Sequence, residues 1–370
     1  MKNLTWQNPE QLFVAQELIN KVKSKCCGIK VNFYYYTENV LNNNQKCFNF
    51  ARKNKLMYMN KIFAKCLVVG ALSSIFSLMA SCSGSSDNKI IAPDVPSVVG
   101  PHNPLARLEV PKVESGNIFI QHSTKEGNDS VMVYCLEYNP SKFHSRWVAF
   151  RFDALTKQKN TKRSDDPFID DPTLSESHKI GEWGFGKTYK DLNGEAHNDL
   201  SFDRGHMCAS ADRLYSVASN EKTFYMSNMS PQISDFNKGF WNAFEIHVQN
   251  LSQSTIFADT LYVVKGGTIA DGQTIGYIER SNGAKVTIPK YYFMALLCSR
   301  NGNYKAMGFY MEHKAYGYKN GSDVPKDKMK EYCLSIDELE AKTGIDFFHN
   351  LPDNIENQVE SACDPSVWGL

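Results

Sequence analysis

The stretch 201–251 constrains the fold of this chain more than any other, because it joins a polar tetrapeptide to a well-patterned helix. The tetrapeptide is Asp203-Arg204-Gly205-His206. It is typical of a turn or a strand end, since glycine lets the backbone bend and a bend exposes the adjacent imidazole. We therefore expect a short polar loop that presents His206 to a site.

A helix is predicted directly downstream, where apolar residues recur at steps of three and four. Ser234 and Asp235 precede it as candidate N-cap residues. Asn237 and Glu245 lie two turns apart, near the same side, so the helix can present both of them to His206. The apolar residues of this helix are Phe240, Trp241, Phe244, Val248 and Leu251.

These side chains suit one class of chemistry. An imidazole can accept a proton from water near neutral pH. Amide oxygens and waters oriented by a carboxylate suit a hard cation such as Mg2+, and arginine suits a phosphate oxygen. Together they indicate hydrolysis of a phosphodiester. The alternative is that His206 is a structural histidine whose hydrogen bonds are satisfied within a glycine turn.

Three motifs and a glutamate in this region resemble the DNA/RNA non-specific endonucleases, which belong to the ββα-metal (His-Me finger) class and include mitochondrial endonuclease G. The motifs are DRGH, SNMSPQ and DFNKGFW, and the glutamate lies four residues after the tryptophan. The resemblance implies an α+β fold with a mostly antiparallel central sheet of about six strands flanked by helices. It covers the predicted catalytic domain, 117–370.

The resemblance also implies a role for each site residue. His206 would be the general base, Asn237 the direct ligand of Mg2+, for which Mn2+ could substitute, and Glu245 would orient metal-bound water. Asn228 of SNMSPQ would support the geometry of the histidine and the substrate. Arg204 of DRGH is a candidate for stabilising the charge that develops on phosphate.

One position departs from the family pattern, because many members carry arginine one turn after the glutamate and this chain has Gln249. Phosphate contacts there are expected to be weaker. Upstream, the charged and glycine-rich segment 156–200 is predicted to be a long functional loop. In it, Arg163 matches a family arginine that reaches the scissile phosphate; alternatively Arg163 is only solvated, and Lys162 takes this role.

The remaining pattern predicts the strands of the domain. β-branched and aromatic residues mark three strands before the site and three after it, and the segment around Gly127 is a hairpin turn. A capping box at Ser335 opens a short helix that Gly344 closes. The predicted strands are 117–123, 129–139, 146–153, 260–268, 291–299 and 304–312.

The N-terminal part is predicted to precede the catalytic domain. Residues 1–58 are interpreted as a non-native or mis-called extension, with translation starting at Met57 or Met59. Residues 59–81 combine positive charge, an apolar run and small residues, as an export signal does. Cys82 follows in an imperfect lipobox and would carry a lipid.

An alternative for the apolar run is a buried or single anchor helix over 66–80. Residues 82–116, rich in serine, proline and glycine, are predicted to be a flexible tether. The mature protein is therefore expected to be exported and either membrane-anchored as a bacterial lipoprotein, in the periplasm or at the cell surface, or secreted.

Composition and cysteines add less. A formal net charge of +1 gives no overall support for nucleic-acid binding, so any basic surface must be local. In an exported protein some cysteines are expected to pair. Cys333 with Cys363 is the first candidate and Cys208 with Cys298 the second. Zinc is not expected, because the spacings CxxC and HxxxH are missing from the sequence.

The leading hypothesis is a lipid-anchored, Mg2+-dependent endonuclease that cleaves DNA and RNA without sequence preference and leaves 5′-phosphates. Two alternatives remain open. One is a phosphodiesterase narrowed to small or modified substrates, and the other is a non-enzymatic surface lipoprotein that binds nucleic acid.

Overall fold

The computed structural model describes residues 107–165 and 167–370. The predictions for the extension, the export signal, the Cys82 anchor and most of the tether lie outside the described residues. Within the described part, no helix is long and apolar enough to cross a membrane.

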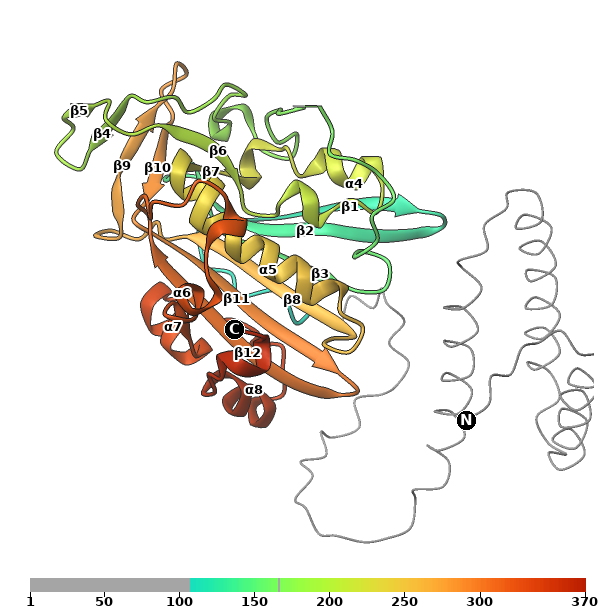
Figure 1. Cartoon of the computed structure of the whole chain (residues 1–370). Coiled ribbons are helices and arrows are strands. Elements are labelled where there is room, and N and C mark those ends of the chain that lie inside the picture. Colours follow the sequence, from blue (N-terminus) through green and yellow to red (C-terminus); the bar gives the residue numbers. More distant parts are fainter. Residues whose placement is uncertain (1–106, 166) are drawn as a thin grey trace, which may run out of the picture. The chain divides into compact units, whose positions relative to one another are not determined.

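A seven-stranded sheet forms the centre of the domain, with all neighbouring strands antiparallel (Figure 1). Its spatial order is β1-β2-β3-β8-β11-β12-β13. The six long strands are those predicted from the sequence, and the two-residue β13 extends the edge. Their bounds are β1 Ile118–Glu126, β2 Asp129–Asn139, β3 His144–Phe152, β8 Thr260–Gly267, β11 Tyr291–Arg300, β12 Asn303–Glu312 and β13 Cys333–Leu334.

Alternation along the strands gives the sheet two buried faces. On β8, for example, Val263 belongs to one apolar cluster and Val264 to the other. The cluster that contains Val263 also holds Phe244 and Val248 of helix α5 (Asn242–Gln253). The cluster that contains Val264 holds residues of helices α7 (Ile336–Thr343) and α8 (Asp353–Glu360). Helices α5 and α7–α8 therefore cover opposite faces.

Two smaller sheets lie on the α5 side of the domain (Figure 1). The first pairs β6 (Phe202–His206) with β7 (Met229–Ile233). The second has the order β10-β9-β4-β5, with bounds β10 Lys285–Pro289, β9 Thr274–Glu279, β4 Tyr189–Asp191 and β5 Ala196–His197. The predicted long loop 156–200 thus contains two short strands and the 3-10 turn η1 (Glu176–His178).

The other helical elements are short. Helix α4 (Val217–Lys222) is capped by Ser216, and α7 begins with the predicted capping box and ends at Gly344 in the left-handed conformation. The remaining elements are α6 Lys326–Lys330, the 3-10 turns η2 Ser210–Asp212, η3 Met226–Asn228, η5 Gly321–Asp323 and η6 Pro365–Trp368, and the π-helical segment η4 Phe236–Trp241.

Asp235 occupies the N-cap position of η4, as predicted, but its side chain makes no capping bond. Ser234, the other candidate, bonds to Ser201 and Asp203 instead. Neither predicted disulfide forms, because all five cysteines from Cys135 onward are free. Cys333 and Cys363 nevertheless lie near one another: burial, then the nearby Cys363, raises the pKa of the Cys333 thiol to about 12.

Candidate active site

His206 is the last residue of strand β6, not part of a free loop. Its backbone partner across the small sheet is Met229, and the neighbouring strand β7 leads through Ser234 and Asp235 into the π-helical segment and α5. The polar tetrapeptide is therefore half of a β-β-helix unit. The sequence identified the strand end correctly and missed the strand pairing.

Gly205 is needed for close packing rather than for a bend. A Cβ atom at this position would lie 2.1 Å from Oε1 of Gln232, whose side chain crosses over the glycine from β7. Gly205 does not adopt the positive φ that turn glycines such as Gly127 have (+64°). The bend that we expected from the sequence is thus replaced by an approach of two strands.

Asn228 holds the chain that follows His206. It is fully buried, its amide oxygen accepts from the Cys208 backbone N–H at 2.8 Å, and its amide nitrogen donates to the carbonyls of Cys208 and Thr223. Because all of these partners are backbone atoms, Asn228 positions the end of β6.

Two phenylalanine rings contact the histidine and both candidate arginines. The His206 ring lies 5.6 Å from the Phe168 ring and 5.0 Å from the Phe224 ring, centroid to centroid. The Arg204 guanidinium lies 3.5 Å above Phe168, and that of Arg163 lies 4.7 Å above Phe224. These cation–π contacts hold the positive charges of Arg163 and Arg204 close to the His206 ring.

The loop that carries Arg163 is tied to the segment after helix α4. The backbone N–H of Ser164 donates to Asn220, and Ile169 bridges to Tyr225. The structure therefore brings the predicted Arg163 beside His206, although it is remote in sequence. The sequence did not single out Phe168 and Phe224, because aromatic residues in a loop carry no pattern of their own.

Burial and positive charge keep His206 neutral. Burial is the main cause that lowers the pKa of its imidazole to about 3, and the charges of Arg163, Lys265 and Arg204 lower it further. A hydrogen bond with the backbone of Arg204 acts in the opposite direction. Among the residues that the structure describes, Nε2 of His206 has no hydrogen-bond partner.

His313 shows what a structural histidine looks like in this fold. Its pKa is also lowered to about 3, mainly by burial, but its Nε2 accepts from the backbone of Ile233 and its Nδ1 donates to Pro289. Both ring nitrogens of His313 are satisfied. His206 differs in the unpartnered Nε2 and in the arginines beside it, which argues against the structural alternative.

Asn237 lies in the π-helical segment beside Asp203. Its amide nitrogen donates to Oδ2 of Asp203 at 3.1 Å, so the amide oxygen is the atom of Asn237 suited to a cation. In an ideal α-helix, Asn237 and Glu245 would point about 80° apart. A π turn takes an extra residue, which turns Asn237 back toward the side of Glu245.

Glu245 belongs to a buried charge network. Lys265 of β8 is fully buried, and its Nζ lies 3.1 Å from Oε1 of Glu245 and 3.1 Å from Oδ2 of Asp212. Gln249, which replaces the family arginine, donates to the other oxygen of Asp212 at 2.9 Å. Lys265 of the central sheet thus supplies a positive charge next to Glu245, whereas helix α5 lacks the family arginine at position 249.

Attraction between Lys265 and the two carboxylates favours the charged form of the lysine. Burial lowers the pKa of Lys265, but Asp212 and Glu245 outweigh this effect and hold it above its ordinary value. Burial raises the pKa of the Glu245 carboxyl, against the attraction of Lys265. The sequence did contain a signal for Lys265, because strand alternation places it on the same covered face as Val263.

The donor atoms here suit a hard cation. Asn237 offers an amide oxygen, and Asp203 and Glu245 offer carboxylates. Cys208 is the nearby soft candidate, but burial raises the pKa of its thiol to about 12, so it stays protonated and is a poor ligand.

Comparison with known proteins places this chain. A sequence profile of the DNA/RNA non-specific endonuclease family matches residues 114–354, which include β6, β7, α5 and both arginines. The chain belongs to this family. The mostly antiparallel α+β fold, with the β6–β7–α5 unit at the site, is the ββα-metal fold expected of it.

Individual relatives are nucleases of bacteria and mitochondria. The chain is 29% identical over 233 residues to a nuclease of Nostoc sp., covering 62% of this chain and 76% of the relative. It is 25% identical over 223 residues to human mitochondrial endonuclease G, covering 59% and 68%. With human mitochondrial nuclease EXOG it shares 26% identity over 227 residues, covering 59% of this chain and 56% of the relative.

A crystal structure of an EndoG/EndoGI complex is also similar. The match has a TM-score of 0.47 and 21% sequence identity, and it covers 64% of this chain and 89% of the other.

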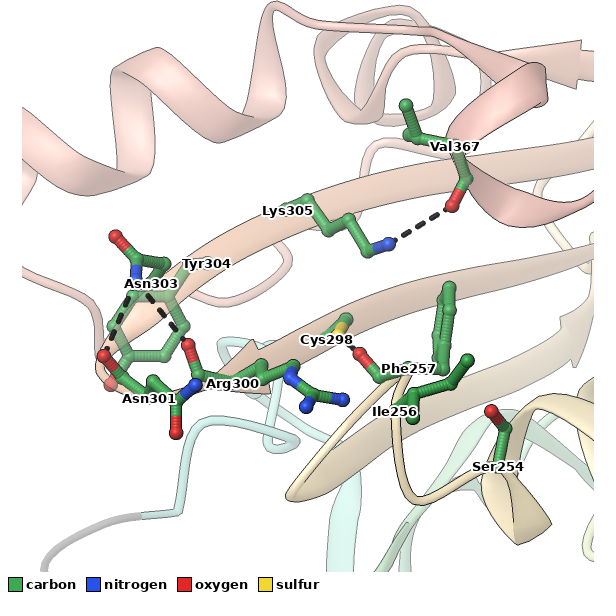
Figure 2. A pocket seen from close by; sticks show the side chains of 10 residues that line it. All are labelled: Ser254, Ile256, Phe257, Cys298, Arg300, Asn301, Asn303, Tyr304, Lys305 and Val367. Carbon is green, nitrogen blue, oxygen red and sulfur yellow. Dashed lines mark hydrogen bonds between the residues drawn. The ribbon is translucent and has the colours of Figure 1, made fainter. Parts of the chain in front are cut away.

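A cavity of about 530 Å³ lies elsewhere, between the loop after α5 and the ends of β11 and β12 (Figure 2). Its cations are bonded to nearby backbone carbonyls: Lys305 donates to the Val367 carbonyl at 3.0 Å and Arg300 to the Thr255 carbonyl at 2.9 Å. The residues that line it include neither His206 nor Asn237. This cavity is separate from the candidate active site.

Proposed function

We propose that this protein is a divalent-metal-dependent endonuclease that hydrolyses phosphodiester bonds of DNA and RNA without sequence preference. The observation that carries the proposal is the buried, neutral His206 with an unpartnered Nε2, flanked by two arginines. A neutral imidazole can accept a proton from water, and guanidinium groups can hold a phosphate.

Asn237 would hold the cation, Mg2+ or in its place Mn2+, and Glu245 would orient its waters. When bound, a divalent ion would supply positive charge that stabilises the negative charge on the phosphate and on the departing 3′-oxygen. The fit rests on the all-oxygen donor set and on the protonated Cys208 thiol.

The protein's own groups account for the proton and the charge. His206 takes a proton from the attacking water, whose oxygen bonds to phosphorus, and the bond from phosphorus to the 3′-oxygen breaks. Arg163 and Arg204 compensate the negative charge that builds on the phosphate oxygens. The products are a 5′-phosphate and a 3′-hydroxyl, the latter formed when the departing oxygen takes up a proton. Asn228 keeps the end of β6 in place.

The proposal extends to the location of the enzyme. The export pattern of 59–81 and the lipobox cysteine support a protein that is exported and lipid-anchored through Cys82. An anchored nuclease would act on nucleic acid outside the cytoplasm.

The proposal is tested with a plasmid-cleavage assay on wild type and on two variants. His206→Ala should lose about 10²–10⁴-fold in rate, because the proton acceptor is gone. Asn237→Ala should lose activity comparably, but higher Mg2+ should restore part of it by mass action. Added imidazole, and not Mg2+, should restore a fraction of the His206→Ala rate.

Three results would contradict this mechanism. They are full wild-type activity in excess EDTA, near wild-type cleavage by folded His206→Ala, and equal Mg2+ rescue of both variants. Cleavage of short dinucleotides but not of plasmid would favour the narrowed phosphodiesterase. Binding of DNA without any cleavage would favour the non-enzymatic lipoprotein.

A further inference from the structure

Three carboxylates meet on the face of the sheet opposite the active site. Asp337 and Glu340 lie one turn apart on α7, and Glu360 is the last residue of α8. One oxygen of each lies within 4.8 Å of the others. Both helices pack on the α7–α8 face of the sheet through apolar residues such as Leu339 and Val359. The carboxylates therefore converge where the two helices meet.

Glu360 is the residue that calls for an explanation. Its side chain is only 5% exposed, and its Oε1 is buried without a hydrogen-bond partner among the described residues. It also lies at the C-terminal end of α8, where the helix dipole disfavours a negative charge. A buried carboxylate in this position requires either a proton or a cation.

The surroundings add negative charge. Burial, followed by Glu340, Glu356, Asp337 and Asp346, raises the pKa of Glu360 to about 9. Burial is also the main cause that raises the pKa of Glu340 to about 7, although its carboxylate accepts from the backbone of Phe347.

The cations of neighbouring elements are directed elsewhere. Lys112 pairs with Asp346 at 3.6 Å, in a contact that is open to solvent at both ends. Lys342 of α7 lies 5.4 Å above the Tyr310 ring. Arg146 pairs with Glu114 and donates to the carbonyl of Gly344. The three carboxylates therefore lack a lysine or arginine that would balance them within the described part of the chain.

We propose that Asp337, Glu340 and Glu360 form a second cation site, which binds Ca2+ and links α7 to α8. Only oxygen ligands converge, which selects a hard ion. Ca2+ binds oxygen at about 2.3–2.6 Å and can therefore bridge oxygens up to roughly 5 Å apart. Mg2+, with contacts of about 2.0–2.1 Å and strict octahedral geometry, spans less. The site is structural and takes no part in hydrolysis, because the sheet separates it from His206.

Thermal unfolding of the full chain, first stripped with EDTA, tests the site. At pH 8, Ca2+ in large excess should raise Tm of wild type by about 3 °C or more. The same concentration of Mg2+ should give a smaller rise than Ca2+.

Variants separate this site from the catalytic one. Glu360→Gln keeps the shape of the side chain and should abolish the Ca2+-dependent rise, and Asp337→Asn should reduce it. Asn237→Ala removes the proposed catalytic ligand and should leave the rise unchanged. Glu221→Gln, the same change at an exposed position on α4, should also leave it unchanged.

The proposal is overturned if wild type shows no Ca2+-dependent rise at pH 8, or if Glu360→Gln shows the same rise as wild type. Loss of the rise in Asn237→Ala alone would assign the ion to the catalytic site. An equal response to Mg2+ would remove the preference for calcium. Should Glu360→Gln fail to fold, Asp337→Asn, whose residue is exposed, supplies the deciding comparison.

Discussion

Two asparagines in neighbouring motifs show that surroundings decide what a residue does. Asn228 is fully buried and its amide is hydrogen-bonded to backbone atoms, so it can position other groups but cannot reach a substrate. Asn237 is only partly buried and makes its amide bond to Asp203. The motif residues thus divide into those that hold the site together and those that can touch a ligand.

Positive charge beside His206 should be visible in the pH dependence of cleavage. Arg163→Gln removes the largest charge effect that lowers the pKa of His206, so that pKa should rise. Because His206 must be neutral to accept a proton, the acid limb of kcat/KM should move to higher pH, by on the order of one unit. Arg300→Gln, which removes an arginine of the remote cavity, should not move it.

The same group links stability to pH. A folded pKa lowered to about 3 means that the unfolded chain binds the proton more tightly. The contribution of His206 to stability is therefore fully present above about pH 6.5 and is lost as pH falls toward 3.

For the pH dependence of cleavage, an acid limb of kcat/KM that stays in place in Arg163→Gln would show that this arginine does not act on the histidine.

At the scale of elements, strands β6 and β7, the π turn and helix α5 form one unit that is fastened to the central sheet. Lys265 makes this connection, since it reaches from β8 to Glu245 of α5 and to Asp212 of η2. A buried ion pair of this kind is costly to break, because removing one partner leaves an uncompensated charge behind.

Lys265→Met should therefore lower the free energy of unfolding by about 3–5 kcal/mol, measured by urea denaturation. Combining it with Asp212→Asn should restore part of the loss, because one unpaired carboxylate is then removed. Lys314→Met is the matched control, since Lys314 forms an exposed pair with Glu312 and should change stability very little. Equal effects of the two single variants would mean that the buried network contributes no more than a surface pair.

At the scale of the whole molecule, the central sheet separates the two proposed sites. One face carries α5 and the residues of the candidate active site, and the other carries α7, α8 and the acidic cluster. The chain as a whole is nearly neutral, with a formal net charge of +1, so attraction for nucleic acid has to come from local groups such as Arg163 and Arg204.

The N-terminal region should determine where this domain works. Cys82→Ala in the full chain should release the protein from the membrane fraction of a bacterial host, because the proposed site of acylation is gone. Cys66→Ala, a change to another cysteine in the apolar run, should leave it membrane-bound. Fractionation followed by detergent partitioning distinguishes the two, and a membrane-bound Cys82→Ala protein would rule out the lipid anchor.

Periodic and local features could be predicted from the sequence alone. Six strands, the helix that becomes α5 and the capping box of α7 follow from alternation, helical spacing and turn chemistry, which act between near neighbours. The candidate site residues could also be named from the sequence, because DRGH, SNMSPQ and DFNKGFW are contiguous motifs.

Only the tertiary structure decided the contacts between distant segments. It paired β6 with β7, which places the Gln232 side chain where a Cβ atom at position 205 would clash, and so explains the glycine there. It also joined Lys265 to Glu245 and left Cys333 and Cys363 as free thiols. It also gathered Arg163, Phe168 and Phe224 around His206 from separate loops. Such contacts depend on how the two faces of the sheet are covered, and no local pattern of residues records that.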